Sequence, residues 1–231
     1  MDSLRKAGPQ DPFTVLASRA VAEAPLDNPS AVCWPRWVGA GDQIRALLGR
    51  DPAAAVSLDD LYAVSWLLDK LRWIGADDQV VRLAGRAAAE APFSNPLLVC
   101  DLLRALRKAG ADDQVRALLG RNPAAAVPLD NLYAVGSLVS SLRRLGADDQ
   151  VITLANRAAT EAPLDPLTAA FLLDRLREAG AHEQFSTLAE RMPAAGWFDE
   201  FRNIDDHRER FRFGCEWDGS PSAAWTWDDL G

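Results

Sequence analysis

A six-residue phrase that returns at nearly constant spacing constrains this chain more than any other feature. The phrase Gly-Ala-Asp-Asp-Gln-Val begins at Gly75, Gly110 and Gly146. Weaker copies begin at Gly8, Gly39 and Gly180, so the six glycines are 31, 36, 35, 36 and 34 residues apart. A period near 35 residues is typical of stacked helical repeats. We therefore expect helical hairpins that bury their apolar faces only against neighbouring hairpins.

Longer segments repeat at twice this period. Residues 45–64 match residues 116–135 at 17 of 20 positions, and residues 75–93 match 146–164 at 14 of 19. The larger repeating object is thus a block of two hairpins, and duplication of that block explains the sequence. We predict an all-α fold, a right-handed α-solenoid of about six helical hairpins over residues 1–190. We expect residues 191–231 to form a terminal helix and an irregular capping tail.

One hairpin illustrates how its helices are predicted. Apolar residues recur at steps of three and four from Leu61 to Ile74, which predicts an amphipathic helix, with Ser57 as its N-cap. The following helix begins at the Asp pair of the phrase and ends before Pro92. Pro96 then opens another helix, which ends at Gly110.

The two ends of the chain depart from this pattern. Residues 1–8 match the second half of a repeat, which predicts that the chain is the tail of a longer array. After a helix at 12–24, the unit at 29–39 is short and contains Pro35. At the other end, residues 197–213 predict one charged helix. The acidic, Trp-rich remainder has no helical period, and we expect it to fold back as a cap, with a partner-binding tail or disorder as alternatives.

Charge and cysteine content bear on location and partners. The formal net charge of −8 disfavours a nucleic-acid-binding surface, which is usually basic. Three widely separated cysteines without a C-x-x-C pair fit a reduced, cytoplasmic protein. The sequence has no apolar leader and no run of 18 apolar residues, so we expect no signal peptide and no membrane span.

The alternation of helix, Gly turn, helix and Pro over about 34 residues resembles the tetratricopeptide repeat. Residues 99–110, continued by Asp113 and Gln114, carry the resemblance best, and Ala87 and Pro92 stand where that family favours Ala and Pro. Leu68, Leu103 and Leu173 depart from it, because the family keeps that position small. The chain is also similar to helical-repeat proteins of actinobacteria that end in a comparable Phe-Gly…Trp-Asp-Asp-Leu tail.

The resemblance implies binding through a concave inner groove rather than chemistry. An arginine stands three residues before each turn glycine, at positions 5, 36, 72, 107, 143 and 177. These arginines either grip carboxylates of a partner or pair locally with the Asp residues of the next helix. Further positions that the resemblance places in the groove include Cys100, Ser140 and Asp174. The candidate partner-binding residues are Tyr62, Asp69, Arg72, Trp73, Arg104, Arg107, Lys108, Tyr133, Arg143, Arg144 and Arg177.

Signals for catalysis are poor. The sequence contains no phosphate-binding, zinc-protease, nucleophile-elbow or dinucleotide-binding pattern. His182 replaces an Asp of the phrase and is expected at a surface helix start. The cluster Asp205-Asp206-His207 with Glu209 has metal-type side chains, but neighbours on a helix point about 100° apart.

We therefore expect a non-catalytic protein- or peptide-binding scaffold in the cytoplasm, with no cofactor, metal or membrane. The alternatives are a nucleic-acid-binding repeat protein and a non-functional fragment of a longer repeat protein. Trp66 and Trp73 lie seven residues apart on one helix near Tyr62. Their equivalents in the second block are Ser137 and Arg144. The two tryptophans form either an exposed binding patch or a surface that packs on the preceding unit.

Overall fold

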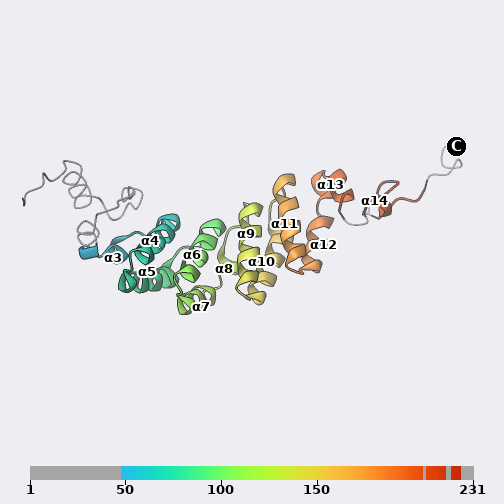
Figure 1. The fold of residues 1–231 in the computed structure, drawn as a ribbon. Coiled ribbons are helices and arrows are strands. Elements are labelled where there is room, and N and C mark those ends of the chain that lie inside the picture. The colour runs from blue at the N-terminus through green and yellow to red at the C-terminus, as the bar shows by residue number, and fades with distance from the viewer. Residues whose placement is uncertain (1–47, 205–206, 217–219, 225–231) are drawn as a thin grey trace, which may run out of the picture. The chain divides into compact units, whose positions relative to one another are not determined.

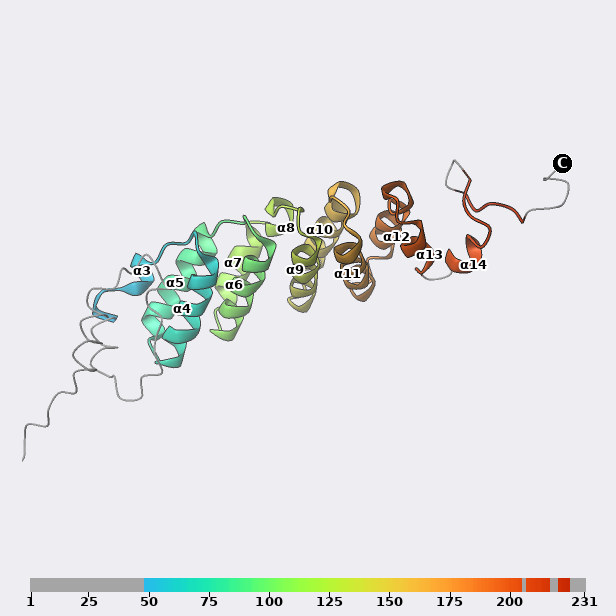
Figure 2. The same ribbon diagram turned by 90° about the horizontal axis from the view of Figure 1, so that it is seen from above.

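The computed structural model describes residues 48–204, 207–216 and 220–224, and all of their regular secondary structure is helical (Figures 1 and 2). No strand occurs among these residues; one isolated antiparallel bridge joins Cys215 to Pro221. The all-α class predicted from the repeat period is confirmed for this part of the chain. The predicted helix at 12–24 and the short unit with Pro35 lie outside the described residues.

The chain divides into two compact units. The first unit comprises the described part of Met1–Pro92 together with Leu98–Arg121, and the second comprises Phe93–Leu97 and the described residues from Asn122 onward. The first unit contains α3 (Pro52–Ala55), α4 (Leu61–Trp73), α5 (Asp77–Glu90), most of α6 (Pro96–Lys108) and α7 (Asp112–Gly120). The second contains α8 (Pro123–Ala126), α9 (Leu132–Arg144), α10 (Asp148–Glu161), α11 (Pro166–Glu178), α12 (His182–Glu190), the 3-10 helix η1 (Pro193–Ala195), α13 (Phe198–Arg202) and α14 (His207–Arg210).

Within each unit, the packed helices are one or two places apart along the chain. In the second unit α9 contacts α10 and α11, and α12 contacts α10 and α11. In the first unit α5 contacts α3, α4 and α7. We call α4, α6, α9 and α11 the A helices, and α5, α7, α10 and α12 the B helices. Each repeated phrase joins an A helix to the B helix that follows it.

The repeated phrase builds the same turn at all four described copies. Gly75, Gly110, Gly146 and Gly180 have φ angles of 71°, 72°, 68° and 74°, in the left-handed region that favours glycine. After α4, the Gly75 N–H donates to the Arg72 carbonyl, and the Ala76 N–H donates to the Leu71 carbonyl. This pair of bonds is the Schellman motif that ends a helix at Gly. The next helix begins at once, because Asp77 and Asp78 occupy the first turn of α5, beside the positive end of its dipole.

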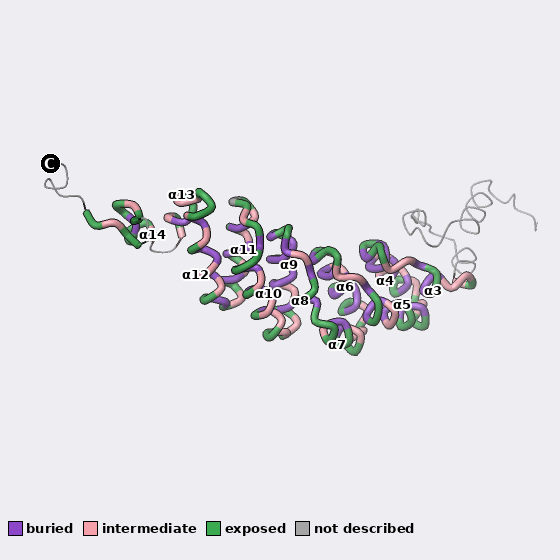
Figure 3. The backbone as a smooth tube through the Cα atoms, turned by 180° about the vertical axis from the view of Figure 1, so that it is seen from behind, coloured by how far each residue is buried: buried purple, intermediate pink, exposed green. Residues whose placement is uncertain are grey.

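The core consists of the small and branched apolar residues that face the neighbouring helices (Figure 3). Leu83 and Ala84 of α5 have no exposed surface, and neither do Leu154 and Ala155 of α10. Each set repeats the other at equivalent positions of the two blocks. Ala on a B helix lets its neighbours approach closely, so the core is built from contacts between hairpins.

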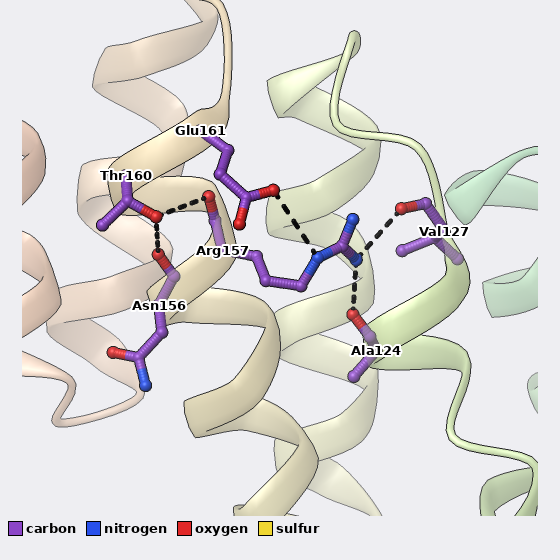
Figure 4. A network of polar contacts seen from close by, with 6 residues as sticks. All are labelled: Ala124, Val127, Asn156, Arg157, Thr160 and Glu161. Atoms are coloured by element: carbon purple, nitrogen blue, oxygen red, sulfur yellow. Dashed lines mark hydrogen bonds and ion pairs between the residues drawn. The ribbon is translucent and has the colours of Figure 1, made fainter.

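An arginine in each B helix, or directly after it, contacts the C-terminal end of an earlier helix. Arg157 Nη1 in α10 donates to the carbonyl oxygens of Ala124 at 2.7 Å and Val127 at 3.1 Å (Figure 4). Val127 is the C-cap residue of α8, and Ala124 lies three residues before it. These carbonyls have no partner within their own helix, so the guanidinium satisfies them and interacts favourably with the helix dipole.

The same contact occurs four times in the described chain. Arg86 donates to the carbonyls of Ala53 and Val56, at the end of α3. Arg121 donates to those of Ala88 and Ala91, at the end of α5, and Arg191 to those of Ala159 and Ala162, at the end of α10. We call Arg86, Arg121, Arg157 and Arg191 the capping arginines. Sequence analysis did not identify them, although they recur at 35, 36 and 34 residues, the same steps as the turn glycines.

The predicted N-cap of α4 is wrong. The helix begins at Leu61, and its N-cap is Asp60, whose Oδ1 accepts from the Ala63 N–H at 3.0 Å. Ser57 instead accepts from the Asp59 N–H in a local turn before the helix. In the second block Pro128 replaces Ser57, while Asn131 caps α9 in the place of Asp60. The cap therefore lies three residues later than predicted, because the intervening residues form their own turn.

The single charged helix predicted at 197–213 is also wrong. The segment forms two short helices, α13 and α14. Their rings pack on one another: Phe201 lies 5.0 Å from Phe211 and 4.2 Å from His207, measured between centroids. Burying these rings requires the chain to turn back between the two helices, which one straight helix could not do. Before this segment the chain leaves α12 through η1, whose C-cap residue Gly196 has a φ of 89°.

Candidate functional site

An aromatic stripe runs along α4. Tyr62, Trp66, Asp69 and Trp73 follow one another at steps of four, three and four residues, so they share one helix face. Tyr62 is 63% exposed and Trp73 is 79% exposed, which leaves two large apolar surfaces in water. Trp66 is partly buried, and Lys70 Nζ lies 5.3 Å from its ring centroid. Large exposed aromatic side chains in one row are typical of binding surfaces.

A pocket of about 470 Å³ lies at one end of this stripe. Its lining consists of Asp69, Arg72 and Trp73 of α4 and Lys108 of α6. The Lys108 ammonium lies 3.5 Å from Asp69 Oδ2, and about half of each side chain remains exposed. Arg72 forms no ion pair within the described residues. The pocket therefore combines an aromatic wall with a guanidinium that is available to an incoming carboxylate. Sequence analysis predicted all four of these residues as partner-binding.

The remaining candidates on α6 are exposed. Arg104 forms an ion pair with Asp101, one turn earlier on the same helix. Arg107 forms no ion pair among the described residues. Cys100, which the resemblance placed in the groove, is buried.

On the equivalent surface of the second unit, Tyr133 is 49% exposed and also packs against a ring of α11. The Tyr133 and Phe171 rings lie 4.6 Å apart, and the Arg175 guanidinium lies 4.8 Å from the Phe171 centroid. Gly136 makes room for this arrangement, because a Cβ there would approach Phe171 Cε1 to 3.0 Å. Phe171 and Arg175 were not predicted, since the equivalent positions in α6 hold Asp101 and Ala105.

The arginines that precede the turn glycines have different surroundings in the four described copies. Arg143 donates to the carbonyl of Glu178, and the Arg177 guanidinium lies 4.7 Å from the Phe185 ring. Arg72 and Arg107 are exposed and form no ion pair with the Asp residues of the next phrase. The local pairing that was one reading of this series is therefore not formed at these two positions. Arg144 is likewise exposed.

The A and B helices differ in charge. In the first unit, α4 and α6 carry five basic and two acidic side chains, whereas α5 and α7 carry three basic and five acidic ones. In the second unit, α9 and α11 carry four basic and two acidic side chains, whereas α10 and α12 carry one basic and five acidic ones. Although the net charge of the chain is −8, the A helices of both units carry more basic than acidic side chains.

Other candidate chemistry finds no assembled site in the described part of the chain. No group of three His, Cys, Asp or Glu side chains there lies close enough to hold a metal ion. His182 is an exposed residue at the start of α12, as predicted. Asp205 and Asp206 lie outside the described residues. Among the described helices, none has the length and apolar character needed to cross a membrane.

Comparisons with known proteins give no family. No protein-family model matches the chain. Neither the curated proteins nor the solved structures that were compared yield a match.

Proposed function

With no family to proceed from, we propose that this chain is a non-catalytic binding protein that recognises acidic protein segments through its A helices. We further propose that its hairpins form a right-handed, tetratricopeptide-like α-solenoid. The observation that carries the proposed function is the α4–α6 pocket, where Trp73 stands beside Arg72 and the Lys108–Asp69 pair.

The chemistry of this pocket favours a segment with both a carboxylate and an apolar side chain. Arg72 offers a guanidinium, which binds a carboxylate through two parallel hydrogen bonds. The exposed face of Trp73 offers an apolar contact, and tryptophan and arginine are the residues most often responsible for binding energy at interfaces. The excess of basic side chains on α4 and α6 attracts an acidic chain over the whole surface.

Single-stranded nucleic acid is the second candidate ligand, because the same surface carries the kinds of side chain that bind it. Aromatic rings flanked by basic side chains also stack on bases and contact phosphates. The acidic B helices and the net charge of −8 oppose the approach of a long polyanion, so we favour a short acidic protein segment. A single-stranded RNA oligonucleotide is therefore one arm of the test.

The second block supplies a matched variant for the experiment. Asp69, Trp73 and Lys108 correspond to Ser140, Arg144 and Glu178. The triple variant Asp69→Ser, Trp73→Arg, Lys108→Glu thus carries residues that the same fold already accommodates at equivalent positions. A control variant, Arg116→Glu, changes charge on α7, a B helix.

The test selects displayed random peptides on the wild-type protein and measures the selected peptides by fluorescence anisotropy. We expect the selected peptides to be rich in Asp and Glu with one aromatic or aliphatic residue. We expect the triple variant to weaken binding at least about thirtyfold, the size of one interface hot spot, and Arg116→Glu to leave it unchanged. Selected peptides that bind the triple variant equally well would refute the proposed site, and tighter, salt-sensitive RNA binding would favour the second candidate.

A further inference from the structure

A second pocket, of about 490 Å³, lies in the second unit at the junction of α12, η1, α13 and α14. Its volume falls within the range of small-molecule sites. Its walls include the rings of Phe198, Phe201, His207 and Phe211. Phe201 and Phe211 are each 4% exposed. Packing against their neighbours therefore holds this part of the wall in place.

The polar groups around these rings are mainly acceptors. Glu190, the last residue of α12, and Glu216, which follows α14, both line the pocket. Neither carboxylate forms an ion pair within the described residues. His207 Nδ1 lies 3.1 Å from the Phe201 carbonyl oxygen. A carbonyl only accepts, so Nδ1 carries a hydrogen.

One basic side chain of the protein already lies against an aromatic ring of this pocket. The Arg210 guanidinium lies 5.5 Å from the centroid of Phe211, and Arg210 also lines the pocket. Arg210 forms no ion pair in the described residues. Among the described residues that line the pocket, two carboxylates face a single guanidinium, which leaves one negative charge unbalanced beside several aromatic rings.

We propose that this pocket binds an organic cation, with an ammonium, guanidinium or amidinium group attached to an apolar body. Aromatic faces attract cations through their quadrupoles, and the attraction grows when the cation is removed from water. Glu190 and Glu216 supply the opposing charge. The site is separate from the α4–α6 pocket and does not depend on the proposed function.

Three probes of the same shape isolate the role of charge. Benzamidine is a planar aromatic cation, benzamide is its neutral counterpart, and benzoate is the anion. Ligand-observed NMR and calorimetry on the full chain measure their affinities. We expect benzamidine to bind at least about tenfold more tightly than benzamide, and benzoate not to bind. Equal binding of benzamidine and benzamide would overturn the proposal, because the pocket would then be merely apolar. Preference for benzoate, or no benzamidine binding at millimolar concentration, would also overturn it.

Substitutions of the acidic and the basic residues that line the pocket should change benzamidine affinity in opposite directions. Glu190→Gln and Glu216→Gln should each weaken benzamidine binding about threefold, the size expected for a partly exposed charge pair. Arg210→Gln should strengthen it by a similar factor, because a competing cation is removed. Glu183→Gln, also on α12 but outside the pocket lining, is the control and should have no effect. Weaker binding in Arg210→Gln would contradict the charge argument.

A second pair of probes tests whether the bound cation belongs to a protein side chain or to a free small molecule. The blocked peptide acetyl-Gly-Arg-Gly-amide presents a guanidinium on a chain, whereas phenethylamine presents an ammonium as a free small molecule. Tighter binding of the peptide would identify the site as a receptor for a basic side chain of a partner. Tighter binding of the amine would identify a metabolite-type ligand. Binding of neither would overturn the proposal.

Discussion

Replacing Arg157 by Met tests whether the capping arginines hold successive hairpins together. The variant keeps a flexible apolar stem that fills the same space but loses both hydrogen bonds to the end of α8. The arginine side chain is only 25% exposed, so water replaces those bonds incompletely. The Ala124 and Val127 carbonyls would then lose their donor near the negative end of a helix dipole.

The expected loss follows from these two bonds. A hydrogen bond with a charged partner contributes about 1.5–3 kcal/mol when buried. One nitrogen serves both acceptors and part of the side chain is solvated, so we expect a total loss of about 2 kcal/mol. The ion pair with Glu161 adds little, because its atoms are 4.0 Å apart and the Glu161 side chain is 62% exposed.

Urea unfolding followed by circular dichroism measures this change, and amide hydrogen exchange assigns it to the second unit. Two controls separate the capping contact from general effects of charge. Glu161→Gln and Arg116→Met each remove a solvent-exposed ion pair and should cost less than about 0.5 kcal/mol. A loss in Arg157→Met no larger than in Arg116→Met would refute the reasoning.

Two further predictions concern the turn phrase and the contact between α5 and α3, and both are measured as urea midpoints at constant m value. Gly110→Ala should cost about 1 kcal/mol because φ is 72° there, whereas Gly85→Ala, inside α5 with nothing within 4 Å of the added Cβ, should stabilise by about 0.5–1 kcal/mol. Changes of the same sign at the two glycines would contradict this account. Gln79→Ala should cost about 1–3 kcal/mol, because the Gln79 Oε1 accepts from the buried Ala53 N–H at 3.1 Å. The equivalent Gln114→Ala should cost less than about 0.5 kcal/mol, and equal losses would show that the bond is unimportant.

The sequence predicted local structure correctly at positions where the backbone conformation favours one residue type. Gly75 and its three described equivalents, Gly110, Gly146 and Gly180, were identified as helix ends, and each has the positive φ that this role requires. Pro96 begins α6, as predicted from its missing N–H. The N-cap of α4 was misplaced because Ser57 and Asp60 are both good caps, and only the path of the chain decides between them.

The candidate site was predicted in part. Asp69, Arg72, Trp73 and Lys108 do line one pocket, because the repeat places equivalent positions of successive A helices on one face. The packing of Tyr133, Phe171 and Arg175 on one another in the second unit could not be predicted. It depends on Gly136, whose missing side chain matters only once α9 and α11 are in contact.

By itself, the sequence determined the helical class and the positions of the four turns in the described part of the chain, because the spacing of glycine, proline and apolar residues acts over one or two helical turns. The tertiary structure alone decided which arginines cap a preceding helix, which face of α4 stays open, and how Phe201, His207 and Phe211 enclose a pocket. Each of those features depends on contacts between residues that are far apart in the sequence. The periodicity of the sequence does not predict such contacts.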